Sequence, residues 1–383
     1  MFIQSEYSPA EIAIRKIIIE RGPITFAEFM EIALYYPSGG YYTNRNAFGP
    51  MGDFFTAPVA HPVFGTLIAE QIRLLWKAFG MPPKFNVVEL GAGNGQLGID
   101  VMASSSFMYT DYAKALNYIA SDLSSKPPDY PGTWIQGNMD EKIEGPAVIL
   151  ANELLDAMPV HRVTVHQSKM LEIFIGLDEN GHFKEILGEL STIEIGKKFN
   201  DLGISLDEGY RTEINIGLAK WLQSMYSMMD SGYLLLIDYG HESIDYYSET
   251  RPEGTLRCYY AHTLNMDPYR HVGKQDISVH VDFTNLRKIA HETGFDFLEM
   301  KTQAQFLLDL GINHYRGKIS ESNQLDRVTK NRNTRLIDLL IDKRSMGGFG
   351  VFLFGKNAPS PTSYSLEGSF NAPLILATQR HMP

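Results

Sequence analysis

The sequence predicts an α/β protein built on a mostly parallel, doubly wound sheet. From Phe85 onward, short apolar runs alternate with helical stretches, and a glycine cluster follows the first run directly. A hydrophobic content of 44% with 21% charged residues is ordinary for a globular protein, and 383 residues suffice for one large elaborated domain or for two domains. The runs predicted as strands are 86–90, 117–121, 133–136, 146–151, 232–238, 295–300 and 349–355.

The region before the first strand, residues 1–84, is predicted to be helical. Ser8 and Pro9 suit the N-cap and first turn of a helix that runs to Glu20, and Gly22 with Pro23 ends it. Two further helices are expected over 25–34 and 61–79. The sheet region then occupies residues 85–356, and a loop-like tail covers 357–383.

An insertion at about 160–210 interrupts the alternation of strands and helices. Apolar and polar residues alternate with period two on both sides of Gln167-Ser168, and again around Glu179-Asn180-Gly181. The insertion is therefore predicted to be an antiparallel β-hairpin subdomain, followed by a helix over 211–229. A later polar region, residues 241–283, is expected to form loops that shape a substrate pocket.

Charge and composition exclude several classes of function. The net charge of −11 disfavours a nucleic-acid partner, because it would repel phosphates. The single cysteine, Cys258, excludes intrachain disulfides and cysteine-based zinc sites. No apolar run is long enough to cross a bilayer, and the first residues lack the features of a secretory or mitochondrial targeting signal. These observations predict no membrane insertion and a cytoplasmic location.

The segment "NVVELGAGNGQLGID", residues 86–100, predicts a site for a nucleotide-like cofactor. Its glycines fit a dehydrogenase fingerprint at Gly93, Gly95 and Gly98, but that register leaves Gly91 inside or beyond the strand end. The other register places Glu89 two residues before Gly91, Gly93 and Gly95. A carboxylate would repel a pyrophosphate, whereas it suits the sulfonium and amino groups of S-adenosylmethionine.

Two polar residues after the next strands are candidates for contacts with an adenosine group. Asp122 ends the second strand, where a carboxylate can accept hydrogen bonds from both ribose hydroxyls. That contact would serve NAD equally well, so it does not decide the cofactor. Asn138 follows the third strand, where an adenine contact or a plain turn residue is expected.

The segment "ANELLDAMPVHR", residues 151–162, is too polar for the strand that it follows. Asn152, Glu153 and Asp156 are expected at the cofactor site, because ligands bind at the carboxyl ends of parallel strands. If the turn is helical, Glu153 and Asp156 share a face and could hold a guanidinium group between them. The alternative is that these acids cap the next element and face solvent.

Two more segments carry candidate functional residues. In "PMGDFFTAPVAHPVFG", residues 50–65, Asp53 and Thr56 suit either helix capping or a lid over the cofactor. Residues 254–283 contain several histidines and aspartates, but none of the spacings is that of a compact ligand pair on one helix. No metal is therefore expected.

Several motifs in sequence order resemble the MidA-like S-adenosylmethionine-dependent methyltransferases, a family that includes a mitochondrial complex I assembly factor. The resemblance covers about Pro37 to Gly355. The motifs that carry it are "GGYY" (39–42), "GDFFTAP" (52–58), "VFGTLIAEQI" (63–72), "ELGAGNGQLGIDVM" (89–102), "ANELLDAMPVHR" (151–162), "IDYG" (237–240), "GTLRCYYAH" (254–262), "DPYRHVGKQDISVHVDF" (267–283) and "TQAQFLLDLGI" (302–312). Two positions depart from the usual pattern, at Ala92 and at Val59-Ala60.

The resemblance implies a Rossmann-like class I methyltransferase core, with S-adenosylmethionine as donor and S-adenosylhomocysteine as product. The acceptor that it implies is a protein arginine on a respiratory complex I-type subunit, and a homodimer is compatible with it. When the roles of the family's motif residues are transferred to this sequence, the resemblance implies that the donor loop is formed by Glu89, Gly91, Gly93 and Gly95. It implies that Asp122 is the acid that binds the ribose, and that Glu153 and Asp156 are the acids that bind the methyl acceptor. A non-catalytic assembly protein that keeps this fold is the alternative, and an NAD-dependent dehydrogenase is disfavoured by Glu89.

Overall fold

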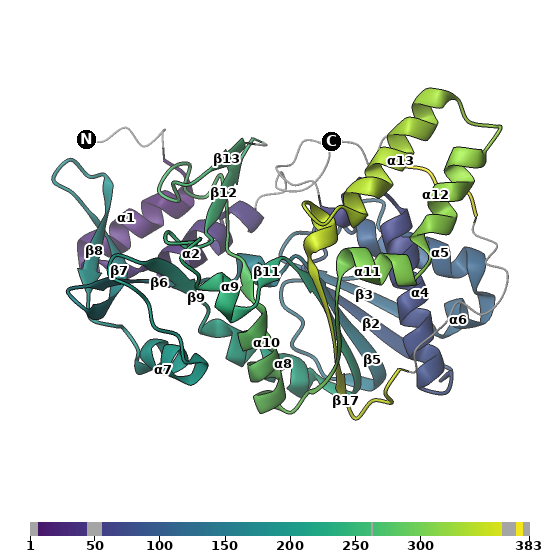
Figure 1. The fold of residues 1–383 in the computed structure, drawn as a ribbon, viewed down its shortest axis with the longest axis horizontal. Coiled ribbons are helices and arrows are strands. Elements are labelled where there is room, and N and C mark those ends of the chain that lie inside the picture. Colours follow the sequence, from purple (N-terminus) through teal and green to yellow (C-terminus); the bar gives the residue numbers. More distant parts are fainter. Residues whose placement is uncertain (1–6, 44–55, 262, 362–372, 378–383) are drawn as a thin grey trace. The chain divides into compact units, whose positions relative to one another are not determined.

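The computed structural model describes residues 7–43, 56–261, 263–361 and 373–377, which belong to two units (Figure 1). The auxiliary unit comprises Met1–Ala47, Leu155–Trp221 and Gly240–Ile289. The core unit comprises Phe48–Leu154, Leu222–Tyr239 and Ala290–Pro383. The predicted N-terminal region 1–84 is therefore shared between the units, and its first helices join the predicted insertion.

The core unit is built on a seven-stranded sheet, and each of its strands was predicted from an apolar run. The strands are β2 (Phe85–Leu90), β3 (Leu116–Asp122), β4 (Thr133–Gln136), β5 (Ile143–Asn152), β10 (Met229–Asp238), β16 (Asp296–Thr302) and β17 (Gly350–Lys356). Their order is β16-β17-β10-β5-β2-β3-β4. The strands from β4 to β10 are parallel, whereas β17 runs antiparallel to both of its neighbours. The carboxyl ends of β2, β3 and β5 therefore lie along one edge.

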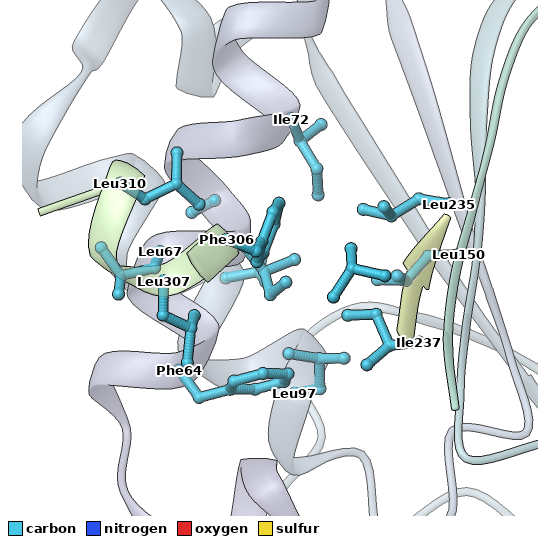
Figure 2. Close-up of a cluster of buried hydrophobic side chains, with 14 of the residues drawn as sticks. Phe64, Leu67, Ile72, Leu97, Leu150, Leu235, Ile237, Phe306, Leu307 and Leu310 are labelled. Atoms are coloured by element: carbon cyan, nitrogen blue, oxygen red, sulfur yellow. The ribbon is translucent and has the colours of Figure 1, made fainter. Parts of the chain in front are cut away.

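Helices cover the core sheet with completely buried side chains. They are α3 (Ala57–Ala60), α4 (Val63–Ala78), α5 (Gln96–Met108), α6 (Thr110–Ala115), α11 (Gln303–Asp309), α12 (Ile312–Glu321), α13 (Arg327–Ile341) and the short η3 (Met346–Gly348). Figure 2 shows Phe64 and Phe306 from these helices in one cluster with Leu150, Leu235 and Ile237 from the strands. Burying each such side chain stabilises the fold by about 1.5–3 kcal/mol. Helix α4 confirms the prediction for 61–79.

The auxiliary unit contains a five-stranded antiparallel sheet. Its strands are β1 (Ile24–Thr25), β6 (His161–His166), β7 (Lys169–Leu177), β8 (Phe183–Gly188) and β9 (Arg211–Ile214). The predicted hairpin at Gln167-Ser168 is confirmed, and positive φ angles of 52° and 61° at these two residues are those of a tight hairpin turn. Strand β1 lies between the helices α1 (Pro9–Arg21) and α2 (Phe26–Tyr35) and pairs with β7.

The helix predicted over 211–229 begins later than expected. Residues Arg211–Ile214 form β9, which pairs with β6, and the helix α8 spans Gly217–Met228. By pairing with β6, this short segment buries three of its four side chains, those of Thr212, Glu213 and Ile214. The side chain of Asn215 then accepts a 2.9 Å hydrogen bond from the backbone N–H of Leu218 and so caps the start of the helix.

The predicted loop region 241–283 contains short strands among its described residues, which are all but residue 262. The strands β12 (Arg257–Tyr260), β13 (Thr263–Asn265) and β14 (Asp276–Ser278) form a small antiparallel sheet, and β11 (Gly240–His241) pairs with β15 (Val281–Asp282). The remaining elements of this part are α7 (Ile193–Leu202), α9 (Ser243–Tyr246), α10 (Phe283–Thr293), η1 (Tyr41–Thr43) and η2 (Leu155–Ala157).

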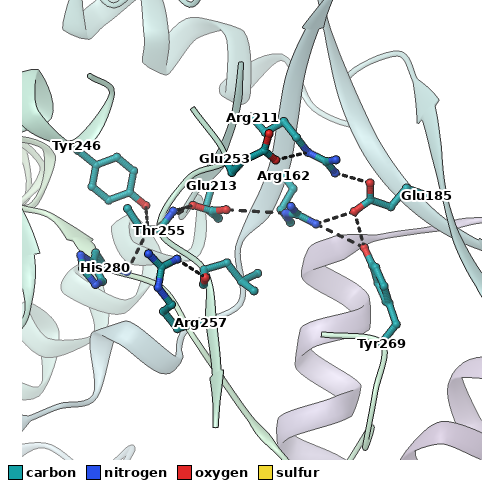
Figure 3. Close-up of polar contacts among 11 residues, drawn as sticks. Arg162, Glu185, Arg211, Glu213, Tyr246, Glu253, Thr255, Arg257, Tyr269 and His280 are labelled. Atoms are coloured by element: carbon teal, nitrogen blue, oxygen red, sulfur yellow. Dashed lines mark hydrogen bonds and ion pairs between the residues drawn. The ribbon is translucent and has the colours of Figure 1, made fainter. Parts of the chain in front are cut away.

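A network of paired charges links the strands of the auxiliary unit (Figure 3). The guanidinium of Arg162, only 8% exposed, donates a 2.8 Å hydrogen bond to Glu185, which also pairs with Arg211 and accepts a hydrogen bond from Tyr269. On the other side of Arg162, the buried carboxylate of Glu213 accepts hydrogen bonds from Thr255. Nε of Arg162 and Oε1 of Glu213 are 3.8 Å apart without a hydrogen bond, and burial raises the pKa of Glu213, so the hydrogen-bonded charge pairing of Arg162 lies on the Glu185 side.

Candidate functional site

The glycine cluster after β2 forms a tight loop that only glycine can occupy without strain. Gly91, Gly93 and Gly95 have φ angles of 68°, 57° and 75°, in the left-handed region. A Cβ atom on Gly91 would lie 2.8 Å from Cδ1 of Leu154, and one on Gly95 would lie 2.6 Å from the ring of Tyr130. Gly95 is the N-cap of α5, so the loop leads directly into a helix N-terminus, where backbone N–H groups can bind an anionic group.

Asp122, at the end of β3, holds this loop in place. Its Oδ2 accepts a 2.8 Å hydrogen bond from the backbone N–H of Gly93, and its Oδ1 accepts one of 2.7 Å from Ser124. The structure thus brings the predicted ribose acid to the glycine loop. An ionised carboxylate has about four acceptor positions, so two remain for ligand hydroxyls. The ribose contact itself stays a prediction.

Glu89 lies beneath the start of α5 and is only 4% exposed. Its Oε2 accepts a 2.8 Å hydrogen bond from the hydroxyl group of Tyr118, and a Cβ atom on Gly98 would lie 3.1 Å from the same oxygen. Burial raises the pKa of Glu89 to about 8. The carboxyl group is therefore largely protonated at neutral pH, and its support for a cationic ligand stays a prediction.

Asn152 ends β5 and Glu153 follows it, beside the glycine loop. The side-chain amide of Asn152 donates a 3.2 Å hydrogen bond to Oε1 of Glu153. Glu153 has a φ angle of 50°, and its backbone N–H donates to the carbonyl of Ile237 at 2.8 Å. A non-glycine residue in the left-handed region costs free energy and is common at functional sites. Leu154 then packs at Gly91, which places these residues at the end of the strand that neighbours β2.

Asp156 belongs to the auxiliary unit and is 4% exposed. It is the central residue of the 3₁₀ turn η2, which begins at Leu155. The left-handed Glu153 lies before this turn, so the two acids do not share a helical face as the sequence suggested. The short turn follows from packing, because Leu155 and Ala157 on either side of Asp156 are also buried.

The other predicted positions are less informative. Asn138 is exposed two residues after the end of β4, and Asp53 lies outside the described residues. Thr56 is the N-cap residue of α3 but makes no side-chain capping bond. Among the residues that the structure describes, no group of three or more histidine, cysteine, aspartate or glutamate side chains is arranged to hold a metal ion.

Sequence reasoning did not single out the aromatic pair beside the glycine loop. Tyr130 and Trp134 meet edge to face with their ring centroids 5.1 Å apart, and the indole N–H of Trp134 donates to the carbonyl of Ser124. The pair therefore joins the loop at Gly95 to the residues that follow Asp122. The available signal was a tyrosine just before the third strand and a tryptophan four residues later inside that strand.

These features fit a ligand with an anionic end and a nucleoside end. The N-terminus of α5 offers backbone N–H groups to a carboxylate, and Asp122 offers acceptor oxygens to ribose hydroxyls. S-Adenosylmethionine has both groups. Comparison with known proteins decides between this donor and NAD.

Residues 67–301 match a family of S-adenosyl-L-methionine-dependent methyltransferases. The chain belongs to this family. A crystal structure from Burkholderia thailandensis bound to S-adenosyl-homocysteine has a TM-score of 0.80 and 29% sequence identity, covering 91% of this chain and 92% of that chain. The cofactor of this methyltransferase is therefore S-adenosylmethionine, and the predicted Rossmann-like fold is confirmed.

Relatives with assigned names cover most of this methyltransferase. "Protein arginine methyltransferase NDUFAF7 homolog, mitochondrial" from Drosophila melanogaster is 29% identical over 73% of this chain and 70% of its own length. "Protein arginine methyltransferase NDUFAF7, mitochondrial" from Homo sapiens is 26% identical over 85% of this chain and 78% of its own length. These names agree with the resemblance found in the motifs.

Proposed function

We propose that this methyltransferase modifies an arginine side chain of a protein, and that its substrate is a respiratory complex I-type subunit. The names of its relatives support arginine as the acceptor. The complex I-type subunit rests on the resemblance to the MidA-like family. Protein recognition also agrees with the negative net charge of −11, which favours a cationic side chain over a nucleic acid.

The observation that carries the proposal is the acidic segment after β5, next to the strand that bears the glycine loop. Glu153 follows Asn152, the last residue of β5, and Leu154 packs against Gly91 of the loop. Ligands of open α/β sheets bind at this edge. An acid in this position can accept hydrogen bonds from a guanidinium group whose nitrogen must face the methyl donor.

The residues of the protein would position and orient the acceptor. When bound, S-adenosylmethionine supplies an electrophilic methyl group, and its transfer leaves S-adenosylhomocysteine and releases one proton from the guanidinium nitrogen. Asp122 and the loop at Gly93 would hold the donor. Glu153 and Asp156 would accept hydrogen bonds from the guanidinium and fix its plane, and proximity of this kind can contribute about 7–11 kcal/mol in the best cases.

A labelling experiment tests the proposal. Cell lysates are incubated with isotope-labelled S-adenosylmethionine, with and without the protein, and labelled residues are identified by mass spectrometry. We expect label on an arginine of one or a few proteins, only when the protein is present. Label on another residue type would contradict arginine as the acceptor. The absence of any labelled protein would favour the non-catalytic assembly protein.

Location and assembly are separate parts of the proposal. No helix within the described part of the chain is long and apolar enough to cross a membrane. The relatives are named mitochondrial, whereas the sequence predicts a cytoplasmic location. Cell fractionation decides the location, and light scattering on the purified protein shows whether it forms a homodimer.

A further inference from the structure

Within the described part of the chain, a buried aspartate of the auxiliary unit has one carboxylate oxygen without a well-formed hydrogen bond. Asp276, the first residue of β14, is completely buried. Its Oδ1 accepts a 2.6 Å hydrogen bond from the hydroxyl group of Tyr42. Its Oδ2 is buried and makes no well-formed hydrogen bond among the described residues, although the nearby side chain of Ser278 and backbone N–H of Ile277 favour the ionised form and so lower the pKa of Asp276. Because leaving a buried polar atom without a partner is costly, the position calls for an explanation.

A second buried carboxylate, that of Asp156, lies close to Asp276. The backbone N–H of Val279, directly after β14, donates a 2.9 Å hydrogen bond to the carbonyl of Asp156. Burial, and then the charge of Asp156, raise the pKa of Asp276 to about 7. Two neighbouring buried carboxylates cannot both be ionised at low cost unless a cation lies with them. The site therefore favours a proton or a positively charged group.

Two stacked tyrosine rings connect these acids. Tyr35 and Tyr42 have ring centroids 5.6 Å apart and planes inclined by 21°. The hydroxyl group of Tyr35 donates a 2.8 Å hydrogen bond to the carbonyl of Ala157, next to Asp156, while that of Tyr42 reaches Asp276. Both rings are only partly buried. Aromatic faces beside carboxylates favour a planar cation, because a guanidinium group both stacks and pairs.

A third tyrosine, Tyr259, lies on the same face of the small sheet as Asp276. Tyr259 in β12 is directly opposite Asp276 in the antiparallel pair of β12 with β14. Side chains at directly opposite positions project to the same side of a sheet. The charge of Asp276 contributes to raising the pKa of Tyr259, after burial, which agrees with their proximity. Three partly exposed rings thus accompany the two buried acids.

We propose that Asp276 and Asp156 together bind the guanidinium group of the substrate arginine, with Tyr42 held against it by its hydrogen bond to Asp276. This inference rests on the proposed function and adds Asp276 as a guanidinium-binding residue that the sequence did not assign. A guanidinium presents several N–H donors in one plane and can bond to two carboxylates at once. The compact ammonium group of lysine cannot match this arrangement in the same way.

Binding of small probes to the full-length protein tests the proposal. With S-adenosylhomocysteine present, Nα-acetyl-arginine methylamide, its neutral citrulline counterpart and its lysine counterpart are titrated and followed by NMR. We expect the arginine probe to bind best, and Asp276→Asn to weaken it at least about tenfold, as for loss of one partner of a buried charge pair. Equal binding of the arginine and citrulline probes, or unchanged binding by Asp276→Asn, would overturn it.

Control variants separate binding from folding. Asp276→Asn keeps an acceptor for the Tyr42 hydroxyl, so the fold should persist. Glu172→Gln alters another completely buried carboxylate of the auxiliary unit, one that bonds to His161, and should leave probe binding unchanged. Tyr42→Phe keeps the ring and removes the hydrogen bond to Asp276. Tyr42→Phe should lower the affinity for the arginine probe less than Asp276→Asn does. An unchanged affinity would contradict the role of Tyr42.

Methyl transfer distinguishes failure of this inference from failure of the proposed function. If the protein methylates an arginine and Asp276→Asn has the parent KM and kcat, the inference fails and the function stands. If the protein binds the arginine probe through Asp276 but labels no arginine in any lysate, the inference stands and the proposed function fails. A raised KM for the arginine substrate in Asp276→Asn, with donor affinity retained, supports both.

Discussion

The hydroxyl group of Tyr118 donates a 2.8 Å hydrogen bond to the carboxyl group of Glu89. Burial raises the pKa of Glu89 to about 8. The folded state therefore holds this proton more tightly than the unfolded state, where the pKa is near 4.5. The corresponding stability is complete below about pH 4.5 and is lost as the pH rises through about 8. The Glu89→Gln variant has no carboxyl group to ionise here, so it should keep the free energy of unfolding that the parent loses at high pH, on the order of a few kcal/mol.

Urea unfolding of parent and Glu89→Gln at several pH values measures the effect. The variant should match the parent most closely in mild acid and exceed its stability in mild alkali. Glu144→Gln, at an exposed position near the start of β5, serves as control and should follow the parent at every pH. Stability curves of parent and Glu89→Gln that run parallel would show that Glu89 is not the group responsible.

Gly95→Ala should disrupt the donor loop. Gly95 has a φ angle of 75°, and a Cβ atom would lie 2.6 Å from the ring of Tyr130. The left-handed backbone alone costs a side chain about 1–2 kcal/mol, and the clash must displace either the ring or the loop. We expect the affinity for S-adenosylhomocysteine, measured by calorimetry, to fall more than about tenfold, since 1.4 kcal/mol corresponds to a factor of ten.

Gly203→Ala is the matched control for backbone strain. Gly203 follows α7 with a φ angle of 65°, and no atom lies within 4 Å of a Cβ built there. The variant should lose similar backbone stability and keep the donor affinity of the parent. A similar loss of donor affinity in both variants would mean that general destabilisation, and not the loop at Gly95, is the cause.

Asp122→Asn should weaken the donor site in two ways. The amide retains one acceptor oxygen, so one of the N–H groups of Gly93 and Ser124 loses its partner, and ribose hydroxyls lose a charged acceptor. Hydrogen bonds to charged groups contribute about 1.5–3 kcal/mol, which predicts a loss of donor affinity of roughly ten- to a hundredfold. Asp129→Asn, exposed in the following loop, should change nothing, and equal affinities of both variants would contradict the role of Asp122.

The sequence predicted the core sheet well because each of its strands coincides with a short apolar run, and the strands β2, β5, β10 and β17 are buried over most of their length. It did not predict β1, which has two residues and pairs with β7 about 150 positions away. It also placed a helix where β9 forms, since a four-residue edge strand has little periodicity of its own. Burial of Glu89 under α5 and the approach of Asp276 to Asp156 depend on tertiary packing, which local patterns do not encode.

Glu153→Gln should abolish methyl transfer while leaving donor binding nearly intact. Glutamine has the same shape and can keep the bond to Asn152, so the change isolates the charge of a residue held at a φ angle of 50°. Loss of a positioned charged group should lower kcat by roughly a hundredfold or more. Transfer of labelled methyl groups measures this, with Glu144→Gln as the control. Equal activity in variant and parent would remove Glu153 from the site.

Binding of an arginine probe should release a proton near neutral pH. The carboxyl group of Asp276, with a pKa of about 7, is partly protonated when free, and a guanidinium beside it favours the ionised form. Affinity should therefore rise with pH through about 7 and then level off. Among the residues that the structure describes, the titratable groups near Asp276 are Tyr35, Tyr42, Asp156, Cys258 and Tyr259.

Burial raises the pKa values of Tyr42, Cys258 and Tyr259 above their ordinary values, so these groups stay protonated near neutral pH. Proton release near pH 7 therefore belongs to the pair of Asp156 and Asp276. Calorimetry in two buffers of different ionisation enthalpy measures it, and Asp276→Asn should suppress it. The same proton release in parent and Asp276→Asn would assign the titration to another group and contradict the prediction.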